Sequence, residues 1–459
     1  MKFKLSIIAL LLVSNTLFGF SLFDREEIAT LKEKIEMNYN DPSLHIALAQ
    51  EYDKDFKKSR SIGDLEKVFD ELQIAYGLKP DDLQIVVMNY QVGVMLVKWK
   101  RDEVLLNKLH PLFDFLINAN LNVEPISAIR SSTRKYDPKD KESAKEHINL
   151  FKLALKENNR YFPAYLALAS IYNDTNKYDL SIHMANMGIK LEPKFDKFYL
   201  LKAQSMMNKI EKKDSNSECR IYNDNDNKEI VKNLKKAIEL NKNPNDIEAK
   251  MELSTTYNRM GKNKLSVFIA KQAYDNNPNE LTKMNLIVNY TEATQIDKSL
   301  ELLKDFSPKN EFIEIQKMYE LAQIYYLKED WKNSTEYFED LIDTGNVTNF
   351  YTYLYYTIAL NANKKEKDFS TLDNLPQKVK MTKWKETVKT YIQNNISDEI
   401  LLSKATDKCK KTEAFFLIGQ NKLLDNNIPE ARELFKKVLK EEAYSYKEYI
   451  AAKYLLTKY

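Results

Sequence analysis

The chain of 459 residues contains only 8 glycines and 12 prolines. Sandwiches, barrels and doubly wound sheets need many tight turns, and many of these turns need glycine for its backbone freedom. A sheet-rich fold is therefore not expected. What the chain does contain is 43% hydrophobic and 30% charged residues, which is the composition of a folding protein and not of a disordered one. Its length exceeds what one core usually holds, which favours several domains or an elongated array.

Cysteine and histidine are also scarce. The two cysteines, Cys219 and Cys409, do not make a disulfide framework, and we expect an extended array to hold them apart. The four histidines are scattered, and no cluster has metal-ligand spacing. The glycines are too isolated to form a phosphate-binding loop, and no nucleophile stands in a pattern with a base. We expect no catalytic residue, no metal, no cofactor and no enzymatic activity.

Neither sign of charge dominates, since the formal net charge is +3. General nucleic-acid binding needs a basic excess or stripe, so we expect no nucleic-acid partner. No stretch after the first residues is apolar enough to span a bilayer, so we expect no integral span once the start is removed. Lysines around Trp384 would suit acidic partners or lipid headgroups and suggest peripheral envelope association. Lysines on a helix more often only keep it soluble. They are Lys378, Lys380, Lys383, Lys385 and Lys389.

Residues 1–19 have the pattern of a signal peptide. Lys2 and Lys4 form a basic start, and an apolar run follows from Leu5. We expect cleavage before Phe20 and a periplasmic or secreted protein. The alternative is an uncleaved membrane anchor. A bacterial lipoprotein would need a cysteine at the cleavage site, and none is present there.

One interval recurs four times along the chain. A large apolar residue in one helical segment and a core residue in the next are separated by the same number of positions each time. The pairs are Leu168 and Ala185, Leu253 and Ala270, Leu321 and Phe338, and Ile418 and Phe435. Small residues stand where the two helices must approach closely. In the first segments they are Ala169, Ser254, Ala322 and Gly419, and in the second Ser181, Ser266, Ser334 and Ala431.

This pattern resembles the tetratricopeptide repeat (TPR), a helix–turn–helix unit of about 34 residues. The resemblance implies an all-α fold, a right-handed α-solenoid of TPR-like helical hairpins, some of them degenerate. Pro193 and Pro278 fit this reading because proline stops a helix. The final unit, with its extension from Ser445 to Tyr449, is also similar to the end of NlpI-type envelope TPR lipoproteins.

We divide the chain by the strength of the repeat pattern. The predicted parts are a signal peptide at 1–19, an N-terminal degenerate TPR-like helical region at 20–140, a central TPR array at 141–345 with an insertion at 211–228, and a C-terminal helical region at 346–459 that ends in a TPR unit. Residues 376–405 are predicted to be helical, without an assigned register. The insertion is polar and is interpreted as a mobile turn or a docking loop.

In TPR arrays the first helices of the hairpins line a concave face. Residues of these helices that do not pack inward would contact a ligand, and Asn, Gln and Tyr suit an extended peptide. The peptide-groove candidates are Asn173, Met251, Thr255, Asn258, Asn285, Asn289, Tyr319, Gln323 and Tyr326. The alternative is a groove that is solvated or filled by the protein's own segments.

The expected function is that of an exported TPR scaffold or adaptor that binds peptide or protein partners in the bacterial cell envelope. A second hypothesis is a structural subunit of a larger envelope assembly. A third is a glycan-processing enzyme with a helical scaffold, which would need a catalytic module that no stretch is left to house.

Overall fold

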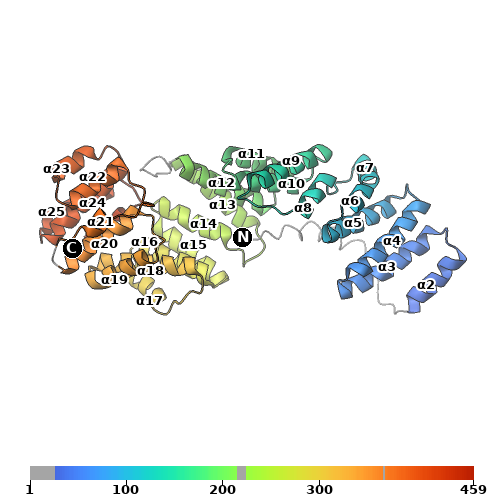
Figure 1. Cartoon of the computed structure of the whole chain (residues 1–459), viewed down its shortest axis with the longest axis horizontal. Helices are drawn as coiled ribbons and strands as arrows, with labels where there is room; N and C mark the ends of the chain where they lie inside the picture. Colours follow the sequence, from blue (N-terminus) through green and yellow to red (C-terminus); the bar gives the residue numbers. More distant parts are fainter. Residues whose placement is uncertain (1–25, 214–223, 365–366) are drawn as a thin grey trace. The chain divides into compact units, whose positions relative to one another are not determined.

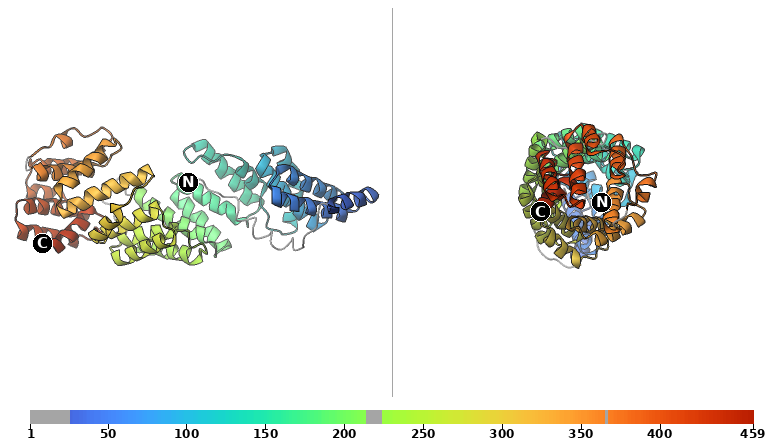
Figure 2. Two further views of the ribbon diagram at one scale, coloured as in Figure 1. Left: turned by 90° about the horizontal axis from the view of Figure 1, so that it is seen from below. Right: turned by 90° about the vertical axis from the view of Figure 1, so that its left-hand side faces the viewer.

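The computed structural model describes residues 26–213, 224–364 and 367–459, and these residues form α-helices without any strand (Figure 1). The same helices can be followed in two further views (Figure 2). The predicted all-α fold is therefore confirmed. The predicted signal peptide at 1–19 lies outside the described residues, as does the centre of the predicted insertion at 211–228.

The chain divides into two compact units, Met1–Ile171 and Tyr172–Tyr459. The helices up to this boundary are α2 (Glu26–Met37), α3 (Pro42–Ser59), α4 (Ile62–Leu78), α5 (Leu83–Lys100), α6 (Glu103–Lys108), α7 (His110–Asn118), α8 (Ile126–Thr133) and α9 (Lys141–Glu157), and α10 (Phe162–Asp174) crosses it. The predicted domain boundaries near 141 and 346 stay predictions.

The second unit continues with two groups of helices. The first group is α11 (Tyr178–Leu191), α12 (Asp196–Lys213), α13 (Asp224–Leu240), α14 (Glu248–Arg259), α15 (Asn263–Asn276), α16 (Glu280–Glu292), α17 (Ile296–Lys304), α18 (Glu311–Lys328) and α19 (Trp331–Asp343). The second group is α20 (Phe350–Lys364), α21 (Ser370–Asp373), α22 (Lys383–Ile392), α23 (Asp398–Lys404), α24 (Lys408–Leu424), α25 (Ile428–Lys440) and α26 (Lys447–Lys458).

Consecutive helices pack as hairpins, with close pairs at α12–α13, α14–α15, α18–α19 and α24–α25. Three of the four recurring intervals fall on such pairs, α14–α15, α18–α19 and α24–α25, and Leu253, Ala270, Leu321 and Phe338 are all buried. The pattern that resembles the TPR therefore marks real helical hairpins. No helix in the described ranges is long and apolar enough to cross a membrane.

Small residues allow the helices of a hairpin to touch. A Cβ atom added to Gly419 would lie 2.7 Å from the ring of Phe435. Ser334 is fully buried, and its hydroxyl donates to the carbonyl of Ala322, 3.0 Å away. Larger side chains at these positions would push the paired helices apart, which explains the predicted small positions.

Two regions differ in detail from the sequence pattern. Within the region at 20–140, residues 103–118 form two helices, α6 and α7, because Pro111 near the start of α7 cannot continue a helix from the preceding turn. The helical stretch expected at 376–405 contains α22 and α23, separated by a turn in which Asn394 has a φ of 60°.

Cys409 is buried at the start of α24 and takes part in a disulfide bond. The expectation that the two cysteines stay apart is therefore wrong. It assumed an extended array, whereas the end of the second unit returns to its earlier helices, as when Lys453 of α26 hydrogen-bonds to Asn263 of α15. Cys219, the other cysteine of the sequence, lies outside the described residues.

Candidate partner-binding face

The asparagines of α14 and α16 bond to each other and are not exposed to a groove. The Nδ2 of Asn258 donates to the Oδ1 of Asn289 over 2.9 Å, and the hydroxyl of Ser266 donates to the same oxygen. Asn289 is 1% exposed and Asn258 is 6% exposed. Their side-chain polar atoms are therefore paired with each other in the interior of the second unit.

Two further candidates join neighbouring helices in the same way. The Oδ1 of Asn173 accepts hydrogen bonds from Ser205 and Asn208 of α12, each over 3.1 Å. The Oδ1 of Asn285 accepts from the hydroxyl of Ser254 over 3.2 Å. Ser254 and Asn285 are 31 positions apart, and so are Asn258 and Asn289. This equal offset between polar residues on successive first helices is the sequence signal that would have indicated a ladder of paired side chains.

Three candidates on α18 lie where the chain's own last helix packs. The ammonium of Lys447, on α26, stands 5.9 Å from the ring centroid of Tyr319. Gln323 and Tyr326 are buried. Burial raises the pKa of Tyr319 to about 12. These three side chains of α18 are thus at least partly buried, and Tyr319 faces a residue of α26.

Lys447 supplies the positive charge where α26 packs on α16 and α18. Its ammonium lies 3.5 Å from a carboxylate oxygen of Glu292 on α16 and 3.6 Å from one of Glu320 on α18. Burial raises the pKa of Glu292, because a buried carboxylate loses hydration, and Lys447 opposes that shift. The carboxylates of Glu292 and Glu320 raise the pKa of the Lys447 ammonium in spite of its burial. One cation thus holds two carboxylates from successive hairpins.

The next residue, Glu448, extends the network to α20. Its carboxylate accepts a hydrogen bond from the hydroxyl of Tyr355. Burial raises the pKa of Glu448. A second buried carboxylate, that of Glu413 on α24, accepts from the hydroxyl of Tyr351 and from the indole N–H of Trp384, each over 2.6 Å. Trp384 is therefore an interior anchor and not the centre of an exposed lysine surface.

The far end of α26 and the loop before it contact earlier hairpins. Lys453 donates to Asn263 over 3.1 Å, and the hydroxyl of Tyr459 donates to Glu329 over 2.5 Å. A Cβ atom at Gly261 would lie 2.8 Å from the ring of Tyr444, and Gly261 has a φ of +68°. Helix α26 therefore contacts residues of α15, α16, α18 and α20, in addition to its own neighbours in the last unit.

The side chains of α14 toward α12 remain partly exposed. Met251 and Thr255 are half-buried. Beside them Gln204 donates to Glu248 over 2.9 Å, and Arg259 pairs with Glu211 over 2.7 Å. We call this surface of α12 and α14 the α12–α14 face.

Another polar side chain, that of Glu252, belongs to the α12–α14 face. Burial raises the pKa of Glu252, and the nearby Arg259 opposes that shift. Three carboxylates, those of Glu211, Glu248 and Glu252, thus stand beside one guanidinium. This face carries the groove candidates Met251 and Thr255, which are half-buried, and the hydroxyl of Thr255 donates to the carbonyl of Met251 over 3.1 Å.

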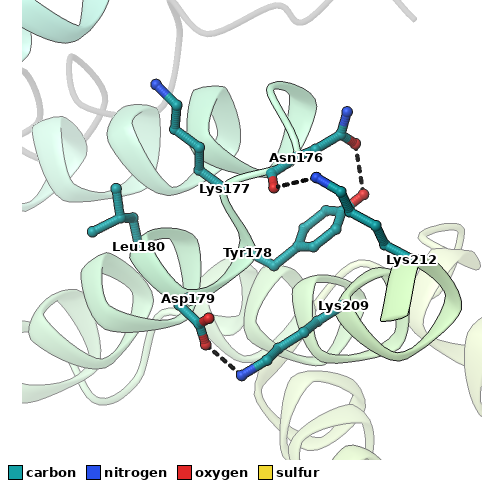
Figure 3. A pocket seen from close by; sticks show the side chains of 7 residues that line it. All are labelled: Asn176, Lys177, Tyr178, Asp179, Leu180, Lys209 and Lys212. Atoms are coloured by element: carbon teal, nitrogen blue, oxygen red, sulfur yellow. Dashed lines mark hydrogen bonds and ion pairs between the residues drawn. The ribbon is translucent and has the colours of Figure 1, made fainter. Parts of the chain in front are cut away.

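A shallow surface cavity of about 450 Å³ lies between α11 and α12 (Figure 3). Two of its three lysines pair with its other residues: Lys209 contacts Asp179 over 2.5 Å, and the ammonium of Lys212 donates to the carbonyl of Asn176 over 3.3 Å. These pairs join α12 to α11 and to the turn before it. The cavity is lined by Asn176, Lys177, Tyr178, Asp179, Leu180, Lys209 and Lys212.

Groups with catalytic potential are buried or dispersed in the described residues. In the first unit the hydroxyl of Ser131 lies 2.7 Å from Nδ1 of His147, but both side chains are buried away from any substrate. Burial lowers the pKa of His147. Across the described ranges, no three His, Cys, Asp or Glu side chains gather closely enough to hold a metal ion.

Solved structures with a similar fold are TPR proteins. A thermophilic TPR protein, TTC0263 of Thermus thermophilus, is 17% identical over 39% of this chain and 91% of its own, with a TM-score of 0.33. YrrB, a TPR protein with an unusual peptide-binding site, is 16% identical over 47% of this chain and 97% of its own, with a TM-score of 0.35.

A human IFIT1 dimer with m7Gppp-AAAA is 12% identical over 91% of this chain and 95% of its own, with a TM-score of 0.38. No family model matches the chain, and no curated protein matches it. The likenesses concern the fold, and the TPR-like hairpins are assigned from the helices of this chain itself. The resemblance of the last unit to NlpI-type lipoproteins stays a prediction.

Proposed function

We propose that this chain is an exported scaffold that binds a peptide or protein partner on its α12–α14 face and acts as an adaptor in the bacterial cell envelope. The observation that carries the proposal is the difference between two parts of one repeat array. At α16, α18 and α20 the chain's own helix α26 contacts the inner side chains, whereas at α14 Met251 and Thr255 stay half-exposed beside polar groups. Apolar contact with a few placed polar groups is the composition of a recognition surface.

The charge of this face indicates the kind of partner. Glu211, Glu248 and Glu252 outnumber Arg259, and Glu252 is partly desolvated. A partner segment that carries a lysine or arginine would pair with these carboxylates, and a pair that is shielded from water is stronger than an exposed one. We therefore propose a basic peptide segment as the ligand. Its binding should weaken as salt concentration rises.

Two features support export as part of this proposal. The start of the sequence has a basic region followed by an apolar run. Cys409 is disulfide-bonded, and disulfides persist mainly in oxidising compartments. N-terminal sequencing of the protein from its native host tests the export step. A chain that begins near Phe20 supports it, whereas an intact Met1 in cytosolic material contradicts it.

Affinity capture tests the partner-binding face. A variant with Met251→Ala, Glu252→Gln and Thr255→Ala should keep its melting temperature and lose the partners captured by the unmodified protein. The matched control changes exposed residues of α15 on the opposite helix of the same hairpin, Lys264→Ala, Lys271→Ala and Gln272→Ala. If the control loses the partners and the α14 variant keeps them, the proposed face is wrong.

A second candidate function, that of a structural subunit, has its own observation. On α15, Leu265 and Phe268 are 46% and 58% exposed, and they stand one helical turn apart. Exposed apolar side chains that share a helix face are typical of protein–protein contacts. Loss of a large native assembly after Leu265→Ser and Phe268→Ser, with capture through α14 unaffected, would favour this function.

A further inference from the structure

Helix α26 combines apolar packing, through Ala451, Ala452 and Leu455, with polar contacts to α16, α18 and α20. The Lys447 ammonium forms ion pairs with Glu292 and Glu320, and the Glu448 carboxylate accepts a hydrogen bond from the hydroxyl of Tyr355. Each of these side chains loses hydration where α26 packs. These polar contacts add less net stability than apolar contacts of the same area would, because desolvation offsets much of the attraction between the charges.

The fit of α26 to this surface is also incomplete. Three residues at helical spacing on α18 have buried polar atoms that find no hydrogen-bond partner among the described residues: Oε2 of Glu320, Nε2 of Gln323 and the hydroxyl of Tyr326. Nε2 of Gln420, on α24, is also buried without a hydrogen-bond partner. An unpaired buried polar group costs about 1–3 kcal/mol. Glu320 contacts Lys447 of α26, so part of this unused hydrogen-bonding capacity lies where the resident helix packs.

We propose that α26 is a replaceable occupant of a helix-binding site formed by α16, α18, α20 and α24, and that a partner helix takes its place. The site would select an amphipathic helix with a lysine or arginine where Lys447 lies, because Glu292 and Glu320 need a cation between them. The same helix would carry acceptors, such as Asp or Asn, for Gln323, Tyr326 and Gln420.

This inference rests on the proposed function, since α26 regulates access to part of the partner-binding surface. In the closed form the α12–α14 face is open to a partner and the surface under α26 is not. In the open form the surface under α26 is added to it. A first contact at the α12–α14 face would therefore precede exchange of α26, and the apparent affinity of the covered site is lowered by the fraction of molecules that are closed.

The test uses the full chain and a labelled synthetic peptide of residues 444–459. Lys447→Met keeps the length of the side chain but removes the cation, which leaves Glu292 and Glu320 facing each other and should release α26. We expect the peptide to bind this variant about tenfold tighter than the unmodified chain, because the surface under α26 is open in a larger fraction of the molecules. A peptide that itself carries Lys447→Met should bind neither protein.

Hydrogen exchange supplies a second readout. In Lys447→Met the amides of α26 should exchange about tenfold faster, while those of α25 keep their protection. The control is Lys436→Met, which removes an exposed lysine paired with Glu433 on α25. If Lys447→Met fails to fold, Tyr355→Phe serves instead, because it removes only the hydrogen bond to Glu448. Peptide binding that is absent from both opened variants, with α26 as protected as α25, would overturn the proposal.

The outcome is separable from that of the proposed function. The α14 variant with Met251→Ala, Glu252→Gln and Thr255→Ala should bind the 444–459 peptide as the unmodified chain does. Peptide exchange with failed partner capture would retain the α26 site and refute the α12–α14 face. Partner capture without peptide exchange would retain the α12–α14 face and refute the α26 site.

Discussion

Asn289 accepts two hydrogen bonds inside the second unit, from Asn258 and from Ser266, and its own Nδ2 donates to the carbonyl of Asn285 over 2.7 Å. An amide at this position therefore has a structural role. Sequence reasoning assigned it to a ligand because asparagine suits a peptide backbone, and it did not consider that the next first helix offers an equally good amide. The choice between these partners depends on packing distance, which a single helix pattern does not contain.

Asn289→Ala should destabilise the protein by about 1–3 kcal/mol, because it strands the buried donors of Asn258 and Ser266. Chemical denaturation followed by circular dichroism measures this loss. The double variant Asn258→Ala with Asn289→Ala should cost less than the sum of the two single changes, since the two side chains share one hydrogen bond. A change within about 0.5 kcal/mol, as at an exposed site, would show that the amides are not buried partners.

Glu448 makes stability depend on pH. Burial raises the pKa of its carboxyl above the 4.5 of an exposed glutamate, so the folded chain keeps a proton at pH values where the unfolded chain has lost it. In that window the free energy of unfolding falls as pH rises. Glu448→Gln should flatten this dependence above pH 4.5 while it keeps an acceptor for Tyr355.

Denaturation series across the acid range measure the effect of Glu448→Gln. Part of the slope should remain, because burial raises the pKa of Glu292 as well. The control is Glu336→Gln on the exposed side of α19, which should leave the slope unchanged. An identical slope in the unmodified chain and in Glu448→Gln would contradict a buried Glu448.

At the scale of helices, the local sequence pattern was sufficient to predict the hairpins but not the packing of α26. The recurring interval predicted α14–α15, α18–α19 and α24–α25, because the two helices of a hairpin are close in sequence and share one apolar stripe. Besides its contacts with α24 and α25, α26 makes contacts that join residues 93 to 190 positions apart, such as Tyr355 with Glu448 and Asn263 with Lys453. No periodicity within a helix encodes contacts at such separations.

The turn between α14 and α15 combines a backbone conformation that favours glycine with a contact to a residue far along the chain. Gly261 has a φ of +68°, which costs other residues about 1–2 kcal/mol, and it faces the ring of Tyr444 in the loop before α26. Gly261→Ala should therefore lower the free energy of unfolding by more than the backbone cost alone. Adding Tyr444→Ala should remove the clash and return the loss to about 1–2 kcal/mol.

Thermal and chemical denaturation of Gly261→Ala, of the double variant with Tyr444→Ala and of Gly345→Ala separate the backbone cost from the contact with Tyr444. Gly345 has the same φ of +68° and nothing within 4 Å of an added Cβ atom, so Gly345→Ala reports the backbone cost by itself. Equal losses for Gly261→Ala and Gly345→Ala would show that the Tyr444 contact is unimportant.

At the scale of the whole chain, the two units differ in how far a change should spread. Repeat arrays transmit perturbations mainly to neighbouring repeats, because each repeat contacts only its neighbours. In the first unit the core around Leu65 is shared by α3 to α8. In the second unit Leu321, on α18, belongs to a core that extends from Met284 on α16 to Leu455 on α26. The nearest-neighbour description therefore suits the first unit better than the end of the second.

Leu65→Ala and Leu321→Ala test this difference. Each removes a buried side chain and should cost about 2–5 kcal/mol through lost burial and a cavity. Hydrogen exchange should then accelerate in α3 to α7 for Leu65→Ala, with α26 unchanged. For Leu321→Ala it should accelerate in α26 as well as in α18 and α19, because α26 packs on the helix that has been weakened. Protection of α26 that is lost in Leu65→Ala, or kept in Leu321→Ala, would show that α26 does not depend on the hairpins that it contacts.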